Sequence, residues 1–313
     1  MIQYRNNLPQ LSDDLFLTDG GLETTLIFHK GWELPHFAAF DLLKHDKGQK
    51  AIREYFHQYL AIALENKIGF ILESPTWRSS EDWGQRLGYS VDQLAQANAN
   101  SIQLMREVRD EYQNQKTKIV ISGCIGPRGD GYDPKFRMSS DEAERYHSVQ
   151  ASQFKNSHAD MITAITMNYV EEAIGITKAA KANGMPVAIS FTVETDGRLP
   201  TGQTLRDAIE QVDQATQNAP AYYMLNCAHP SHFEDILLSG ESWSKRIKGL
   251  RANASRKSHA ELNESETLDE GNPQELGLQY KEIRKSMSHL NVLGGCCGTD
   301  HRHIGEICKA CLN

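Results

Sequence analysis

The feature that most limits the fold is a regular alternation of short apolar runs with longer segments of helical periodicity. The apolar runs are rich in Ile, Val, Leu and Phe and are bounded by polar or glycine-rich turns. Runs of this length and composition are typical of strands that are buried on both faces. The runs cover residues 15–17, 69–72, 118–121, 161–165, 186–191, 222–225, 247–250 and 291–293.

Helical periodicity follows most of these runs. In residues 47–66, for example, Ile52, Phe56 and Tyr59 recur at the spacing of one helix face. Repeated alternation of strand and helix predicts right-handed βαβ units that close into a single (β/α)8 TIM barrel, a fold of the α/β class. A doubly wound open sheet is the second choice, and the absence of a GxGxxG motif after the first run weakens it. The other helical segments are expected at 91–113, 140–157, 170–183 and 204–216.

The length of 313 residues suits one barrel, so residues 1–313 are expected to form a single domain without an appended cobalamin or folate module. Residues 255–275 break the alternation because they are polar and rich in acidic side chains. They are predicted to form a long loop, either a solvated surface excursion or a lid over a substrate.

Charge limits the class of partner. The formal net charge is -8, whereas a nucleic-acid or anionic membrane surface would need clustered Lys and Arg. No apolar stretch approaches 18 residues, and the first residues lack the pattern of a secretory signal. We therefore expect a cytoplasmic protein whose partners are small molecules, with no nucleic acid and no membrane. The oligomeric state stays open, a homo-oligomer included.

Functional residues of a barrel collect at the carboxyl ends of its strands. Polar, cysteine and glycine residues are concentrated directly after the apolar runs of this chain, which is typical of an enzyme. The segments concerned are DGG (19–21), ESPT (73–76), GCIGP (123–127), TMN (166–168), TVE (192–194), NCAHP (226–230), RAN (251–253) and GGCCG (294–298).

Three cysteines stand at such positions: Cys227 after the sixth run, and Cys296 and Cys297 after the eighth. In a cytosolic chain they should be reduced, which favours a metal site over a disulfide. Alternatively, the adjacent pair is simply two small buried side chains. Three thiolates suit catalytic Zn²⁺, which takes three protein ligands and keeps one position open. Such an electron-rich centre favours activation of a substrate thiol for alkyl transfer over hydrolysis.

Two adjacent cysteines reach one ion only if the backbone bends sharply, and the neighbouring Gly294, Gly295 and Gly298 would permit that bend. Other candidate ligands are weaker. His229 is expected to shape its turn or to bind substrate, and Cys124 to pack as a small side chain. The remaining cysteines, Cys308 and Cys311, are expected on a helix as an unpaired pair.

Four segments together resemble the homocysteine S-methyltransferase family: TDGGLET (18–24), ESPTWRSS (73–80), NCAHP (226–230) and GGCCGTD (294–300). They follow the family order over nearly the whole chain, and NC with GGCCG is the specific part. The resemblance implies a (β/α)8 barrel with Zn²⁺ on Cys227, Cys296 and Cys297. It also implies methyl transfer to homocysteine, giving methionine, from a sulfonium or ammonium donor such as S-methylmethionine or S-adenosylmethionine.

The resemblance also implies substrate contacts. Asp19 would hold the amino group of the substrate, Ser74 and Thr76 would lie in a loop that helps to bind the amino acid, and Asn226 would help to fix the ligand loop. Two aromatic residues near the expected mouth, Trp77 and Tyr132, are available to stabilise a cationic donor, although packing is the simpler role.

One position departs from the family pattern. Where members commonly carry Glu-Thr at the end of the fourth strand, this chain has Ile165 and Thr166. Loss of that carboxylate removes a charge-assisted hydrogen bond of roughly 1.5–3 kcal/mol to the substrate ammonium. Asp19 alone, Glu194 or Glu73 could compensate. Otherwise the acceptor is a different small thiol or selenol, and a remote alternative is a zinc-binding protein without catalysis.

Overall fold

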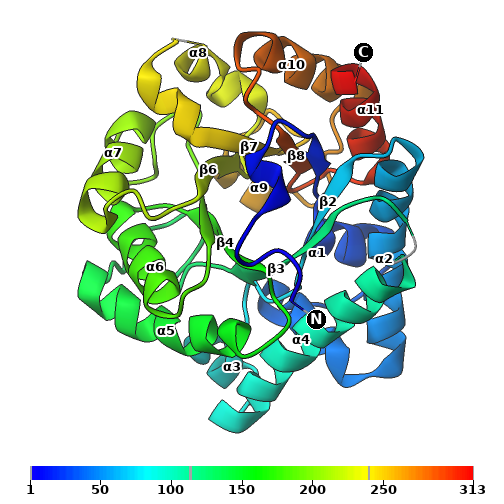
Figure 1. Ribbon diagram of the computed structural model, residues 1–313, viewed down its shortest axis with the longest axis vertical. Helices are drawn as coiled ribbons and strands as arrows, with labels where there is room; N and C mark the ends of the chain where they lie inside the picture. The colour runs from blue at the N-terminus through cyan, green and yellow to red at the C-terminus, as the bar shows by residue number, and fades with distance from the viewer. Residues whose placement is uncertain (1, 113–114, 239, 313) are drawn as a thin grey trace.

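The computed structural model describes residues 2–112, 115–238 and 240–312. Parallel strands follow one another in chain order around a closed barrel, and helices surround it (Figure 1). The barrel closes because β1 pairs with both β2 and β8, which confirms the (β/α)8 fold and excludes an open sheet. The strands are β1 (Phe16–Leu17), β2 (Gly69–Glu73), β3 (Ile119–Ile125), β4 (Met161–Met167), β5 (Val187–Phe191), β6 (Tyr222–Asn226), β7 (Ile247–Ala252) and β8 (Val292–Gly295).

The helices pack their apolar faces against the barrel. The five helices expected from periodicity are confirmed as α2, α4, α5, α6 and α7, each within about two residues of its expected ends. Helix α5 begins at a capping box in which Ser139 and Glu142 satisfy each other's backbone N–H groups. The helices are α1 (Leu22–Thr24), α2 (Asp46–Glu65), α3 (Glu81–Arg86), α4 (Val91–Glu111), α5 (Ser140–Lys155), α6 (Val170–Ala182), α7 (Leu205–Thr216), α8 (Glu234–Leu237), α9 (His259–Asn263), α10 (Pro273–Ser286) and α11 (His301–Leu312).

Residues 255–275 are not loop throughout. They contain α9 and the first turn of α10. Local chemistry explains both, because Ser258 forms a capping box at the start of α9, while Asn272 caps α10 and Pro273 occupies its first position. Periodicity misses α9 because one turn and a half is too short to show a repeat.

The amino-terminal segment covers the amino end of the barrel, in front of the strands in Figure 1. The carboxylate of Asp160, at the edge of β4, accepts the backbone N–H groups of Gln3 and Tyr4. The side chain of Asn291, just before β8, donates to the carbonyl oxygens of Gln10 and Ser12. The chemistry-bearing side chains therefore belong to the opposite, carboxyl end of the barrel, as in other barrels of this type.

The register of the last strands brings their carboxyl ends to one level. Asn226 of β6 lies opposite Arg251 of β7, and Ala252 lies opposite Gly295 of β8. The buried hydroxyl of Tyr280, on α10, accepts the N–H of Ala252 and donates to the carbonyl of Gly294, fixing the two strand ends. Residues that directly follow β6 and β8 therefore lie next to each other. No helix in the described ranges is long and apolar enough to cross a membrane.

Candidate active site

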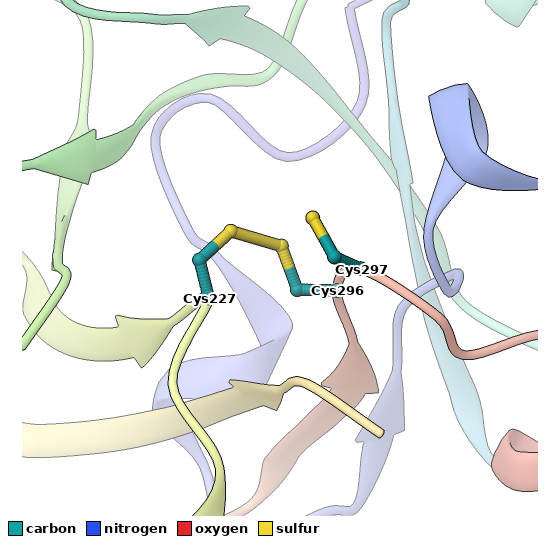
Figure 2. A group of neighbouring side chains, drawn as sticks. All are labelled: Cys227, Cys296 and Cys297. Atoms are coloured by element: carbon teal, nitrogen blue, oxygen red, sulfur yellow. A yellow bond between two sulfur atoms is a disulfide. The ribbon is translucent and has the colours of Figure 1, made fainter. Parts of the chain in front are cut away.

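The structure brings together the three cysteines that the sequence analysis selected. Cys227 directly follows β6, and Cys296 and Cys297 directly follow β8. Their sulfur atoms all lie within 4.8 Å of one another. Figure 2 shows the three side chains converging above the carboxyl ends of the strands. The cluster combines three soft donors of the kind that Zn²⁺ prefers.

Two of these cysteines are joined. Cys227 and Cys296 form a disulfide, shown as the yellow bond in Figure 2, while Cys297 is a free thiol. The expectation that all cysteines are reduced is therefore wrong for this pair. The reason is geometric, because the ends of β6 and β8 direct both side chains to one point. Metal binding by the three sulfurs requires reduction of this disulfide.

The backbone around the cysteines is bent in the way that such convergence requires. Cys227 has a φ of 55° and Gly298 a φ of 79°, both in the left-handed region. That conformation strains a cysteine by about 1–3 kcal/mol, whereas glycine adopts it without penalty. Gly294 and Gly295 serve differently, since they allow close approach: a Cβ there would collide with Thr18 and Thr299 respectively.

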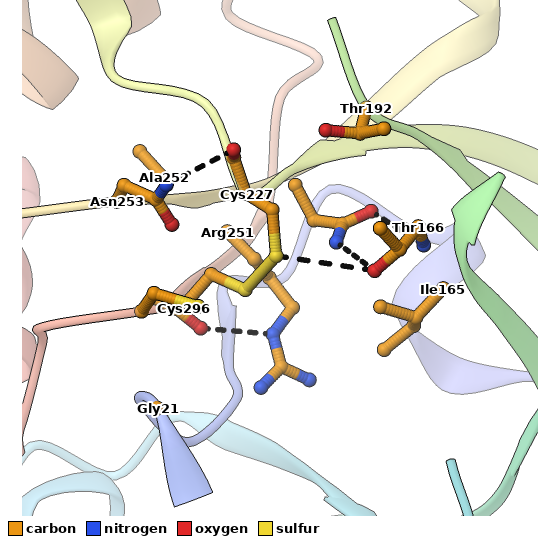
Figure 3. The surroundings of a disulfide bond; sticks show 12 residues. Gly21, Ile165, Thr166, Thr192, Cys227, Arg251, Ala252, Asn253 and Cys296 are labelled. Carbon is orange, nitrogen blue, oxygen red and sulfur yellow. Dashed lines mark hydrogen bonds between the residues drawn. A yellow bond between two sulfur atoms is a disulfide. The ribbon is translucent and has the colours of Figure 1, made fainter. Parts of the chain in front are cut away.

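Residues 252–254, which end and follow β7, hold both cysteine loops (Figure 3). The side-chain amide of Asn253 donates to the carbonyl of Cys227 at 3.0 Å. The backbone N–H of Ala254 donates to the carbonyl of Cys297 at 3.1 Å. The positions of the sulfurs are therefore fixed from the strand between them, which is the support that a preorganised ligand set needs.

Two hydroxyl groups flank the sulfurs. The hydroxyl of Thr166 lies 3.9 Å from the sulfur of Cys227, and that of Tyr132 lies 4.0 Å from the sulfur of Cys297. Asn226 fixes Thr166, since its side-chain oxygen accepts the N–H of Thr166 and its amide donates to the hydroxyl of Thr166. Asn226 also accepts a hydrogen bond from Ser190 at 2.6 Å. Its polar atoms thus connect the ends of β4, β5 and β6 directly before Cys227.

A buried charged group occupies the centre of the barrel end. Arg251 of β7 donates to the carboxylates of Asp19, at 2.7 Å, and of Glu73. Tyr55 donates to the second oxygen of Asp19 at 2.9 Å, and the remaining Nε–H of Arg251 binds the carbonyl of Gly295. Burial raises the pKa of Asp19 and Glu73, and Arg251 opposes that shift. Asp19, expected to hold a substrate amine, is already bound to an arginine.

Glu23 is a further carboxylate at the mouth that the sequence analysis did not select, although it belongs to the TDGGLET segment. The residue is partly exposed on α1, two residues after Gly21, where a Cβ would collide with the carbonyl of Cys296. Burial and the negative charge of Asp19 raise the pKa of Glu23 to about 7. Burial and then the charge of Glu23 raise the pKa of Cys297 to about 11.

His259 is the second residue that the sequence analysis missed. It begins α9, and its Nε2 lies 2.6 Å from the carbonyl of Cys227. Its Nδ1 lies 3.1 Å from the carboxylate of Glu194, and its ring packs against that of Tyr132 at 4.2 Å between centroids. The polar segment 255–275 therefore contributes a side chain to the site. Only the lone His within an acidic stretch could have indicated this.

Other selected residues have local partners. The hydroxyls of Ser74 and Thr76 lie 2.7 Å apart, and both are buried, with Thr76 donating to the carbonyl of Cys124. His229 shapes its turn, since its Nδ1 accepts the N–H of Ser231, and burial lowers the pKa of His229 to about 4. Cys124 packs as a buried small side chain, as expected. Cys308 and Cys311 lie on α11 as free thiols, as expected.

The fold is a closed (β/α)8 barrel, and its carboxyl end carries three clustered cysteine sulfurs that are candidate ligands for a metal ion. Residues 16–311 match the family model of homocysteine S-methyltransferases, so the chain belongs to that family. It is therefore an S-methyltransferase that acts on small molecules.

Solved structures of the homocysteine methyltransferase MmuM from Escherichia coli are similar in fold. The metallated form has a TM-score of 0.75 at 17% identity, covering 95% of this chain and 96% of that chain. The oxidized form has a TM-score of 0.76 at 18% identity, covering 97% and 99%. The apo form has a TM-score of 0.69 at 16% identity, covering 97% and 98%.

Proposed function

We propose that the reduced protein binds Zn²⁺ through Cys227, Cys296 and Cys297 and transfers a methyl group to the thiol of homocysteine, forming methionine. The observation that carries this proposal is the convergence of three cysteine sulfurs within 4.8 Å in a barrel of this family. MmuM, which shares the fold, is a homocysteine methyltransferase with a metallated form. Because the three thiols must be reduced, a cytoplasmic location fits the proposal.

The residues present fit the metal. Three sulfurs on rigid strand ends match the three protein ligands of a catalytic zinc site and leave one position for a substrate. When bound, the ion lowers the pKa of a substrate thiol so that it is a nucleophilic thiolate near neutral pH. Thr166 and Tyr132 lie where their hydroxyls can donate to the cysteine sulfurs, which moderates the negative charge of the ligand set.

The protein's own contribution to the transfer is positioning. A thiolate attacks the donor methyl group in line, a sulfur–carbon bond forms, and the bond from the methyl group to the donor sulfur or nitrogen breaks. A sulfonium or ammonium donor departs as a neutral molecule, so no general acid is needed. Alignment of the reactants supplies much of the rate. The rings of Trp77 and Tyr132 already stack on Arg78 and His259, respectively, so a cationic donor such as S-methylmethionine or S-adenosylmethionine would have to use their other faces.

The pairing of the candidate carboxylates favours an acceptor other than homocysteine. Ile165 places no carboxylate at the end of β4, and Asp19 is engaged by Arg251 and Tyr55. The other candidates are also paired, Glu73 with Arg251 and Glu194 with His259. A substrate ammonium therefore has no unpaired partner among these four positions. Methylation of a different small thiol or selenol is the alternative.

The test is a donor-by-acceptor assay on reduced, zinc-loaded protein. Homocysteine and a panel of other thiols and selenols are offered with S-methylmethionine, S-adenosylmethionine and betaine. Cys297→Ala is expected to lose both zinc and turnover, whereas Cys124→Ala, which alters a packed thiol outside the cluster, is expected to keep both. Turnover of homocysteine supports the proposal. Turnover restricted to another thiol selects the alternative, and activity retained in Cys297→Ala contradicts the zinc assignment.

A further inference from the structure

Arg78 is a buried cation beside the site. It lies in the loop after β2, and its side chain is 5% exposed. Its guanidinium is enclosed by two indole rings, 3.9 Å from the centroid of Trp77 and 3.9 Å from that of Trp83. One nitrogen, Nη1, donates to the carbonyls of Pro127 and Gly129. The side chain is therefore held in one place by stacking and by two backbone carbonyls.

The charge of Arg78 is not balanced by any carboxylate at ion-pair distance within the described ranges, and its Nε is enclosed without a hydrogen-bond partner. Arg251 contrasts with it, because that guanidinium binds two carboxylates. A buried cation without a carboxylate at ion-pair distance is costly. Stacking on aromatic rings and the more distant charges of Asp130 and Glu23 offset only part of the cost. Burial lowers the pKa of Arg78 to about 10, so the side chain stays charged at neutral pH.

Contacts of Trp77 connect Arg78 to the sulfur cluster. The indole N–H of Trp77 donates to the carbonyl of Ile165, whose neighbour Thr166 lies 3.9 Å from the sulfur of Cys227. The charge of Arg78 also acts on Tyr132, whose hydroxyl lies 4.0 Å from the sulfur of Cys297. Arg78 is thus connected through Trp77 to the end of β4, where Ile165 stands in place of a charged residue.

We propose that Arg78 binds the carboxylate of the thiol acceptor, so that the acceptors of this enzyme are mercapto-carboxylic acids recognised by their carboxylate more than by an amino group. This inference rests on the proposed thiol methylation. A planar guanidinium fits a carboxylate with two hydrogen bonds, and an incoming carboxylate would complete both the charge and the hydrogen bonding of Arg78. Asp19 and Glu73 offer a substrate ammonium no equivalent, since both are already bound to Arg251.

Three thiols of similar chain length separate these contributions. Homocysteine carries both groups, 4-mercaptobutanoate lacks the amino group, and 3-aminopropane-1-thiol lacks the carboxylate. With the parent enzyme, kcat/KM for 4-mercaptobutanoate is expected within about tenfold of that for homocysteine. For 3-aminopropane-1-thiol, kcat/KM is expected to be lower by roughly tenfold to a hundredfold, because this thiol lacks the charge-assisted hydrogen bonds that a carboxylate would make.

Variants then assign the effect to Arg78. Arg78→Met is expected to lower kcat/KM tenfold to a hundredfold for the two carboxylate-bearing thiols only, and Arg78→Lys is expected to recover part of the loss. Arg86→Met is the matched control, because Arg86 also stacks on Trp83 but is exposed. Calorimetric titration of zinc-loaded protein with 4-mercaptobutanoate gives a second readout, and thermal unfolding checks that each variant is folded.

The outcomes separate the inference from the proposed function. If the parent enzyme neither methylates nor binds any of the thiols, the proposed function fails. If it methylates thiols with no preference for a carboxylate, only the role of Arg78 is overturned, and this comparison needs no variant. A rise in the KM of the donor with unchanged acceptor preference in Arg78→Met would also overturn it.

Discussion

Some residues of the candidate site could be predicted from their position in the sequence, and others could not. Cys227, Cys296 and Cys297 were predictable because they stand in the short segments after the sixth and eighth apolar runs, and a barrel brings such segments together. The disulfide between Cys227 and Cys296 could not be predicted from the sequence, because pairing depends on where the side chains point. Arg78 and His259 escaped prediction because a charged residue in a polar loop is ordinarily solvated.

Glu23 gives a prediction about pH at the residue scale. Its folded pKa of about 7 lies above the ordinary value for Glu, so its protonated form favours folding, and that contribution is lost as pH rises from about 4.5 through 7. The Glu23→Gln variant keeps this contribution at every pH, because its side chain does not ionise. We expect the variant to match the parent at pH 4 and to be more stable at pH 8 by about 1–3 kcal/mol, discounted for partial exposure.

Urea unfolding at both pH values measures this difference. The same substitution at Glu65, an exposed residue at the end of α2, is the control and should track the parent. Equal effects of Glu23→Gln at pH 4 and pH 8 would show that Glu23 is not constrained as described.

At the scale of elements, all eight strands and the five long helices named above follow from periodicity, because buried strands and amphipathic helices leave direct patterns in the sequence. Helix α9 does not. It is placed by a capping box and by a tertiary contact, the hydrogen bond between His259 and the carbonyl of Cys227. The long polar segment is thus anchored to the site by one histidine.

His259→Ala is expected to lower kcat/KM about tenfold, because the loop that carries Cys227 loses a hydrogen bond and Tyr132 loses its ring partner. The free energy of unfolding should fall by only about 1–2 kcal/mol. Ser258→Ala is the control, since it removes the cap of α9 without touching Cys227. Steady-state kinetics with urea unfolding compares the two. An equal loss of activity in both variants would mean that the helix, not the histidine contact, matters.

For the whole molecule, the barrel separates a stabilising amino end from a reactive carboxyl end. The amino end is closed by the first residues of the chain. This closure could not be predicted from the sequence, because the pattern of these residues is neither helical nor extended. Asp160 is central to this closure: it is fully buried and accepts hydrogen bonds from Arg109, Ile121 and the N-terminal segment.

Asp160→Ala is therefore expected to destabilise the fold by about 3–5 kcal/mol, since it removes a buried ion-pair partner and three backbone contacts at once. Affinity for zinc at the opposite end should stay within about twofold. Asp14→Ala, which breaks an exposed pair with Lys118, should cost no more than about 1 kcal/mol. Chemical denaturation and a competitive zinc titration measure both, and a large loss of zinc affinity in Asp160→Ala would refute the separation of the two ends.

The proposed chemistry depends on a zinc ion held by Cys227, Cys296 and Cys297 with one position open to a thiol. X-ray absorption at the zinc edge of the reduced, zinc-loaded protein tests it most directly. We expect three sulfur ligands and one nitrogen or oxygen ligand, with a fourth sulfur replacing the latter when the acceptor thiol is added. A closed shell that does not change on addition of thiol, or fewer than three sulfurs, would contradict it.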